Sequence, residues 1–139
     1  MWGGAANYHI DKIVRAQKKS IKIMNFVKAR EHIDAPFKNN KILPFGRLRA
    51  LSMNKFIWKL KNDITPFLLP LLCQNRVVES DRDNLKYLIP FRNTRIARSS
   101  VFYSGFIEWN KIPQKLKKSA SVSAFSRNCK DHLLNKLTQ

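Results

Sequence analysis

The sequence is poor in acidic residues and in glycine, and this narrows the chemistry that it can support. Among 139 residues there are nine Asp and Glu and four scattered Gly. The glycines form no Gly-Lys-Ser phosphate loop, no Gly-x-Gly-x-x-Gly turn and no Gly-x-Ser-x-Gly elbow. One acidic cluster, Glu79, Asp81 and Asp83, is interrupted by Arg82 and is expected in a surface loop. We therefore expect no catalytic residue, no metal site and no cofactor.

Cysteine, histidine and long apolar runs are also scarce. Cys73 and Cys129 are far apart in apolar surroundings, which is typical of buried, reduced thiols. The three histidines are not spaced from each other, or from the cysteines, as the ligands of a zinc site are. The longest apolar run, residues 66–73, is too short to span a bilayer, and the first residues lack an apolar signal core. The sequence predicts an intracellular, cytoplasmic or nuclear, soluble protein.

Positive charge dominates what is present. The chain has 27 Lys and Arg and a formal net charge of +18. Residues 1–61 carry a net charge of +11, residues 62–90 of −1 and residues 91–139 of +8. We expect one domain over residues 1–139, with a basic helical part, a neutral connector and a basic C-terminal part. Such an excess predicts an anionic partner, first the RNA or DNA phosphate backbone and second an anionic membrane.

Residues 7–24 have the pattern of an amphipathic helix. At about 100° per residue, one arc of this helix is apolar and the opposite arc is cationic. The apolar arc contains Ile10, Ile13, Val14, Ile21 and Met24. The cationic arc contains Lys12, Arg15, Lys18, Lys19 and Lys22. This row predicts phosphate contacts, and the alternatives are a solvated surface face or a helix that lies on a membrane.

The remaining pattern predicts a mainly α, irregular domain of about four to six helices, with at most one short strand pair. We expect a short helix capped by Asp34, a central helix over 47–61, a short helix over 66–73 and a last helix over 122–137 capped by Ser121. Residues 85–91 favour a strand, residues 93–100 a loop, and residues 101–109 either a helix or a strand. The expected structural residues are Trp58, Trp109, Asn110, Pro113 and Phe125. A base-stacking role for Trp58 is the alternative to a core position.

A second basic patch is expected in the C-terminal part. Arginines recur every third residue in one stretch, and a lysine cluster follows the turn at residues 112–113. Arginine has a fixed fork geometry that suits phosphate. The expected members of this patch are Arg92, Arg95, Arg98, Lys115, Lys117 and Lys118. An exposed basic loop is the alternative for the arginines.

Several short motifs occur in an order that is informative only as a whole. The first half contains Trp2-Gly3, Ile13, Gln17, Lys22-Ile23, Arg30-Glu31-His32, Pro36-Phe37 and Ile42-Leu43. The second half contains Asn93-Thr94-Arg95, Gly105, Trp109-Asn110, Ile112-Pro113, Ser121 and Phe125. In this order the chain resembles, over nearly its whole length, the region C-terminal to the catalytic core in reverse transcriptases of non-LTR (LINE-type, jockey-like) retrotransposons.

The resemblance implies a fragment of an RNA-directed DNA polymerase. The family's catalytic aspartates and its endonuclease are missing from this sequence. In the family, this thumb-like and downstream region helps to hold the RNA template and the target DNA. Met1 would then be an internal methionine of a longer reading frame, and the missing polymerase core would be a partner.

Two hypotheses of different classes follow. The first is a non-catalytic nucleic-acid-binding fragment that is not an enzyme by itself and needs no membrane. The second is a genomic relic, or a structural piece with no independent activity. An independent polymerase is disfavoured because the sequence has no suitable carboxylates.

Overall fold

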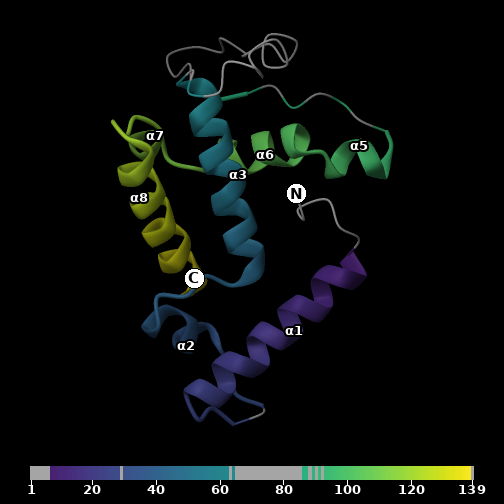
Figure 1. Ribbon diagram of the computed structural model, residues 1–139, viewed down its shortest axis with the longest axis vertical. Coiled ribbons are helices and arrows are strands. Elements are labelled where there is room, and N and C mark those ends of the chain that lie inside the picture. The colour runs from purple at the N-terminus through teal and green to yellow at the C-terminus, as the bar shows by residue number, and fades with distance from the viewer. Residues whose placement is uncertain are drawn as a thin grey trace. The chain divides into compact units, whose positions relative to one another are not determined.

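The computed structural model describes residues 7–28, 30–62, 64, 86, 87, 89, 91 and 93–138 (Figure 1). This part of the chain is mainly helical, which confirms the expected fold class. The helices are α1 (Asn7–Met24), α2 (Asp34–Asn39), α3 (Phe45–Lys61), α5 (Arg95–Ser99), α6 (Val101–Asn110), α7 (Gln114–Lys117), α8 (Val122–Asn135) and the 3-10 helix η3 (Lys136–Thr138). The expected short strand pair is not found among the described residues. The helix expected over 66–73 lies outside them.

Local capping explains where several helices begin. The Ser121 hydroxyl accepts a hydrogen bond from the Ala124 amide at 3.2 Å, as expected for the cap of α8. The Thr94 hydroxyl accepts one from the Ala97 amide at 3.2 Å, so residues 95–99 form α5. The expectation of a loop there was wrong, because a threonine cap satisfies an amide that the loop would have left to water. The ambiguous segment 101–109 is helical as α6.

One expected helix cap needs correction, and the turn at residues 112–113 leads into a helix that was not expected. Asp34 is the first helical residue of α2, and Ile33 occupies the N-cap position without a side-chain cap. The turn that follows Pro113 contains the short helix α7, with Pro113 itself at the N-cap and a φ of −59°. Proline suits this position because its ring already holds φ near the helical value.

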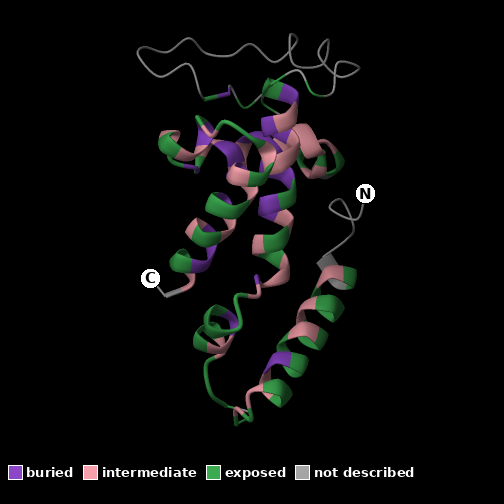
Figure 2. Cartoon of the chain, turned by 60° about the vertical axis from the view of Figure 1, so that its left-hand side comes forward, coloured by how far each residue is buried: buried purple, intermediate pink, exposed green. Residues whose placement is uncertain are grey.

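The chain divides into two compact units. Unit 1 comprises residues 1–49 and 130–139, and unit 2 comprises residues 50–129. The sequence was divided by net charge after residues 61 and 90, whereas the units are divided within α3 and within α8. Each of these two helices contributes residues to both units. Each unit has its own buried residues (Figure 2).

In unit 1, only a narrow line of α1 packs inward. Ile21 is 2% exposed, whereas Ile10, Val14 and Gln17 on the same line are half-buried. Elsewhere in unit 1 the buried apolar residues are Phe37, Leu43, Leu133 and Leu134. Gln17 is the polar member of this line: its Nε2 donates to the Leu43 carbonyl at 2.9 Å, and its Oε1 accepts from the Phe45 amide at 2.8 Å. One side chain thus joins α1 to the backbone that leads into α3.

Helices α1 and α2 both end in the same backbone motif. After α1, the Val27 amide bonds to the Lys22 carbonyl and the Phe26 amide to the Ile23 carbonyl. After α2, Ile42 and Lys41 repeat this pattern on Phe37 and Lys38. These are Schellman motifs, in which the residue after the C-cap takes a left-handed conformation that favours glycine. Here Phe26 and Lys41 take it, each with a φ of 52°, at a cost of about 1–2 kcal/mol relative to glycine.

Aromatic rings form the core of unit 2. Phe106, Trp109 and Phe125 are 0% exposed, and Trp58 is 3% exposed. Tyr87 stacks on Phe106 with ring centroids 4.6 Å apart, while Phe125 lies 5.9 Å from both Trp58 and Trp109. Rings at these separations contribute stability beyond the area that they bury. Trp58, Trp109 and Phe125 therefore lie in the core rather than on a surface that a base could reach.

Asn110 fixes the segment around Tyr87 to this core. Its Oδ1 accepts a hydrogen bond from the Tyr87 amide at 3.0 Å, and its Nδ2 donates to the Tyr87 carbonyl at 2.8 Å. Tyr87 is 8% exposed, so its backbone groups need partners inside the protein. The asparagine amide supplies both partners from the end of α6.

Replacing Asn110 by alanine should destabilise unit 2. The substitution leaves the Tyr87 amide and carbonyl without this partner, and we expect the free energy of unfolding to fall by about 1–3 kcal/mol. Urea denaturation measures the change. Asn128→Ala, at an exposed position of α8, is the matched control and should change stability by less than about 0.5 kcal/mol. Equal stability of the two variants would contradict the role given to Asn110.

Candidate nucleic-acid interface

The basic row of α1 borders a shallow hollow at the C-terminal end of the helix. Its volume is about 610 Å³. Four of the five cations expected to contact phosphate line it, together with three apolar residues. The lining residues are Arg15, Lys18, Lys19, Lys22, Ile23, Phe26 and Val27. Lys12, one further turn back, is exposed but does not line the hollow.

Apolar side chains are exposed around this end of α1. Phe26 is 96% exposed, Ile23 64% and Met24 61%. The sequence placed Met24 and Ile13 on the packing arc, but Ile13 is 43% exposed as well. The difference arises because the inward-facing line runs through Ile21 and Gln17 and is narrower than the apolar arc. The apolar arc therefore extends beyond what unit 1 buries.

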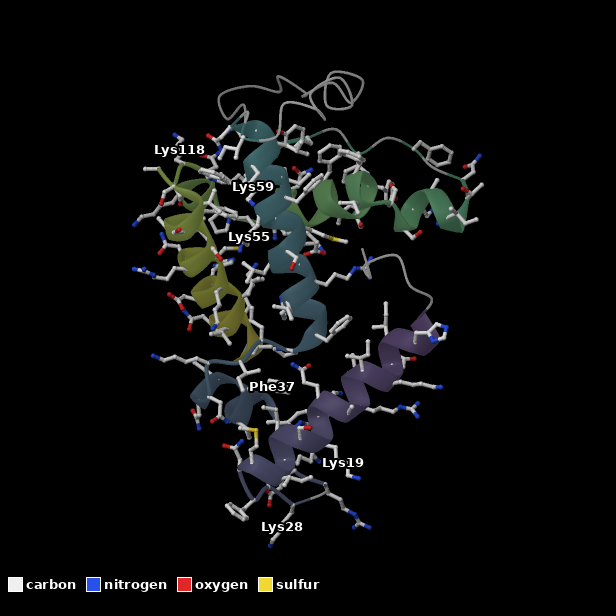
Figure 3. The ribbon with its side chains drawn as sticks, viewed as in Figure 1. Lys19, Lys28, Phe37, Lys55, Lys59 and Lys118 are labelled. Atoms are coloured by element: carbon white, nitrogen blue, oxygen red, sulfur yellow. The ribbon has the colours of Figure 1, made fainter. Side chains whose placement is uncertain are left out.

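Lys28 adds a cation that the sequence pattern did not single out. It follows the Schellman motif and is exposed, and its carbonyl accepts a hydrogen bond from Lys22 Nζ at 3.5 Å. Figure 3 shows Lys19 and Lys28 extending from the same end of unit 1. Lys28 lies outside the amphipathic helix, so helical periodicity gave no signal for it.

The described members of the expected second patch do not form one surface. Arg92 lies outside the described residues, and of Arg95 only the helical backbone is described. Arg98 is exposed on α5, whereas Lys115 and Lys118 are exposed on and after α7. Within unit 2, α5 and α7 lie on opposite sides of α3 (Figure 1). Arg98 therefore lies in a different place on unit 2 from Lys115 and Lys118.

Lys117 lies in the core of unit 2, although the sequence grouped it with the phosphate-contacting lysines. It is 3% exposed, and its Nζ lies 5.3 Å from the centroid of the Trp109 ring. An ammonium at this distance is attracted by the negative face of the ring. We exclude Lys117 from the candidate interface because a phosphate cannot reach a buried ammonium.

Lys118 has a basic neighbour that is distant in the sequence. The pKa of Lys61 is lowered, mainly by partial burial and also by the positive charge of Lys118. Figure 3 places Lys55 and Lys59 on α3 and Lys118 at the turn between α7 and α8. A nearby positive charge disfavours the charged form of a lysine, which is the direction found for Lys61. Lys61 and Lys118 are thus close enough in unit 2 for the charge of one to act on the other.

The described residues show little that is suited to nucleophilic or metal chemistry. They contain no group of three or more His, Cys, Asp or Glu that could hold a metal ion. Cys129 is fully buried, and burial raises the pKa of its thiol to about 11. Within the same residues, no helix has the length and the hydrophobicity needed to cross a membrane.

Lys117 and Lys115 offer a direct test of the core assignment. Lys117→Ala removes the cation–π contact and the packed alkyl chain, so we expect the free energy of unfolding to fall by about 1–2 kcal/mol. Lys115→Ala, two residues away on the same helix and exposed, should change it by less than about 0.5 kcal/mol. Chemical denaturation of both variants measures this, and equal stabilities would show that Lys117 has no core role.

Comparison with known proteins gives no independent assignment. No protein-family model, no curated protein and no solved structure matches the chain. The resemblance to the downstream region of LINE-type reverse transcriptases therefore stays a prediction, which depends on the residues that match its motifs.

Proposed function

We propose that the protein is a non-catalytic nucleic-acid-binding fragment that contacts the phosphate backbone of RNA or DNA through the basic face of α1. The main support for the proposal is the hollow lined by Arg15, Lys18, Lys19 and Lys22, in which none of the described lining residues is acidic. A cytoplasmic or nuclear location fits this role.

The geometry of α1 favours a linear polyanion over a single small anion. From Arg15 to Lys22 the helix advances by about 10 Å, at 1.5 Å per residue. Cations spread over this length on one helix face can contact successive phosphates of one strand. Each such contact releases condensed counterions, which favours binding most at low salt. Contacts of this kind carry no base information, so the binding should be independent of sequence.

The proposal also holds that the protein catalyses no reaction by itself. The sequence resembles a region that, in the polymerase family, helps to hold RNA and DNA, but it lacks the family's catalytic aspartates. The chain would retain the holding function without the chemistry.

A second candidate is a structural piece that needs the missing polymerase core. It is favoured by apolar side chains that are exposed in unit 2, with Phe91 at 84% and Ile96 at 85%. A contiguous exposed apolar patch marks a surface that packs against a partner, and these two side chains would belong to such a patch. A piece of this kind would bind no oligonucleotide and would melt without cooperativity, which calorimetry measures.

The proposed function makes a salt-dependence prediction. Fluorescence anisotropy with a labelled single strand, between about 50 and 200 mM salt, should give a steep linear fall of log K against log salt. In the double variant Lys18→Gln/Lys19→Gln, the slope should become shallower by about 1.4, because each lost phosphate contact contributes about 0.7 for a single strand.

The control variant has the same net charge as Lys18→Gln/Lys19→Gln, but its two substitutions lie outside the hollow. Lys41→Gln/Lys136→Gln removes two exposed lysines of unit 1 that do not line the hollow. This variant should keep a slope within about 0.5 of the parent, since long-range charge alone contributes little at these salt concentrations. A flat salt response of the parent, or equal losses in both double variants, would contradict the proposed interface.

A further inference from the structure

The hollow at the end of α1 combines two kinds of surface that phosphate binding alone does not require. Arg15, Lys18, Lys19 and Lys22 are cationic, whereas Ile23, Phe26 and Val27 are apolar. Phe26 is 96% exposed, the highest value among the exposed large apolar side chains of the described residues. A ligand that matches both surfaces carries negative charge beside a flat apolar group.

The backbone presents the Phe26 ring at some cost to the fold. Phe26 occupies the left-handed position of the Schellman motif that ends α1, with a φ of 52°. Glycine is the favoured residue at this position. Phe26 thus combines an unfavourable backbone conformation with a ring that gains almost nothing from burial. Lys41 shares this conformation, so the feature that indicates binding is the exposed ring of Phe26 beside the cations of the hollow.

We propose that the hollow binds a single-stranded nucleic acid, with one unpaired base stacked on the Phe26 ring and the adjacent phosphates on Arg15, Lys18 and Lys19. The inference rests on the proposed function and names its substrate class. Base faces are accessible to an aromatic side chain only where the base is not enclosed in a duplex. A duplex would still reach the cations but would leave Phe26 without a contact.

Charge and shape together favour a nucleotide as the occupant. Four cations and no carboxylate are found among the described residues that line the hollow. Its apolar part includes a planar ring that every base can cover regardless of sequence. An anionic bilayer would also meet cations and an exposed aromatic ring. Binding to an anionic bilayer is therefore tested directly with vesicles.

The test compares single-stranded and duplex oligonucleotides of the same sequence. Phe26→Gly should weaken single-strand binding by about 5- to 150-fold, the range found when a stacking side chain is removed. Duplex binding should change by less than about twofold. Phe26→Gly should also raise the thermal midpoint, because glycine relieves the left-handed backbone, so a loss of binding cannot be assigned to unfolding. Phe26→Trp, which keeps a flat aromatic face, should bind the single strand as well as the parent.

The control variant removes a second exposed phenylalanine. Phe91 is 84% exposed and lies outside the hollow, so Phe91→Ala should leave both affinities within about twofold. If Lys18→Gln/Lys19→Gln weakens binding and Phe26→Gly does not, the stacking inference is overturned while the proposed function stands. If the parent binds neither nucleic acid, both fail. Co-sedimentation with phosphatidylserine vesicles, lost in Phe26→Gly, with no oligonucleotide binding would replace this inference by a membrane contact.

Discussion

Unit 2 depends on the pairing of one asparagine side chain with the backbone of one buried residue. Tyr87 stacks on Phe106 and is almost fully buried, so its amide and carbonyl are removed from water. No strand lies among the described residues to pair with these groups. Asn110 pairs with both, and the preceding Trp109 lies in the middle of the aromatic core. Two adjacent residues thus satisfy the backbone and fill the interior, and Lys117 covers the tryptophan ring.

In unit 1 the side-chain amide of a glutamine likewise pairs with backbone groups. Gln17 bonds to the Leu43 carbonyl and the Phe45 amide, which fixes α1 to the backbone that enters α3. Because this pairing and the buried Ile21 need only a narrow line of the helix, the rest of α1 stays at the surface. The basic row and the apolar end of the helix are therefore available together for a ligand, and the fold requires neither of them for its core.

Much of this fold could be predicted from the sequence, because helical periodicity is strong in α1 and α8. The limits of α1 and the Ser121 cap were predicted correctly. Residues whose role depends on tertiary contacts could not be predicted. Lys117 has the same chemistry as Lys115, and only the position of the Trp109 ring shows which of the two is buried. Lys61 and Lys118 are far apart in the sequence, so only the structure relates their charges.

The candidate site was also predicted only in part. The cations of α1 follow from helical spacing, but Phe26 lies after the last helical residue and in a conformation that sequence patterns assign to glycine. No periodicity marks such a position.

The most direct test of the central claim is a titration of the ¹⁵N-labelled protein with a single-stranded oligonucleotide, followed by amide chemical shifts. Binding at the basic face and the hollow predicts the largest changes over residues 15–28, with residues of α5 and α7 nearly unaffected. Changes confined to α5 and α7, or no changes at low salt, would contradict the account.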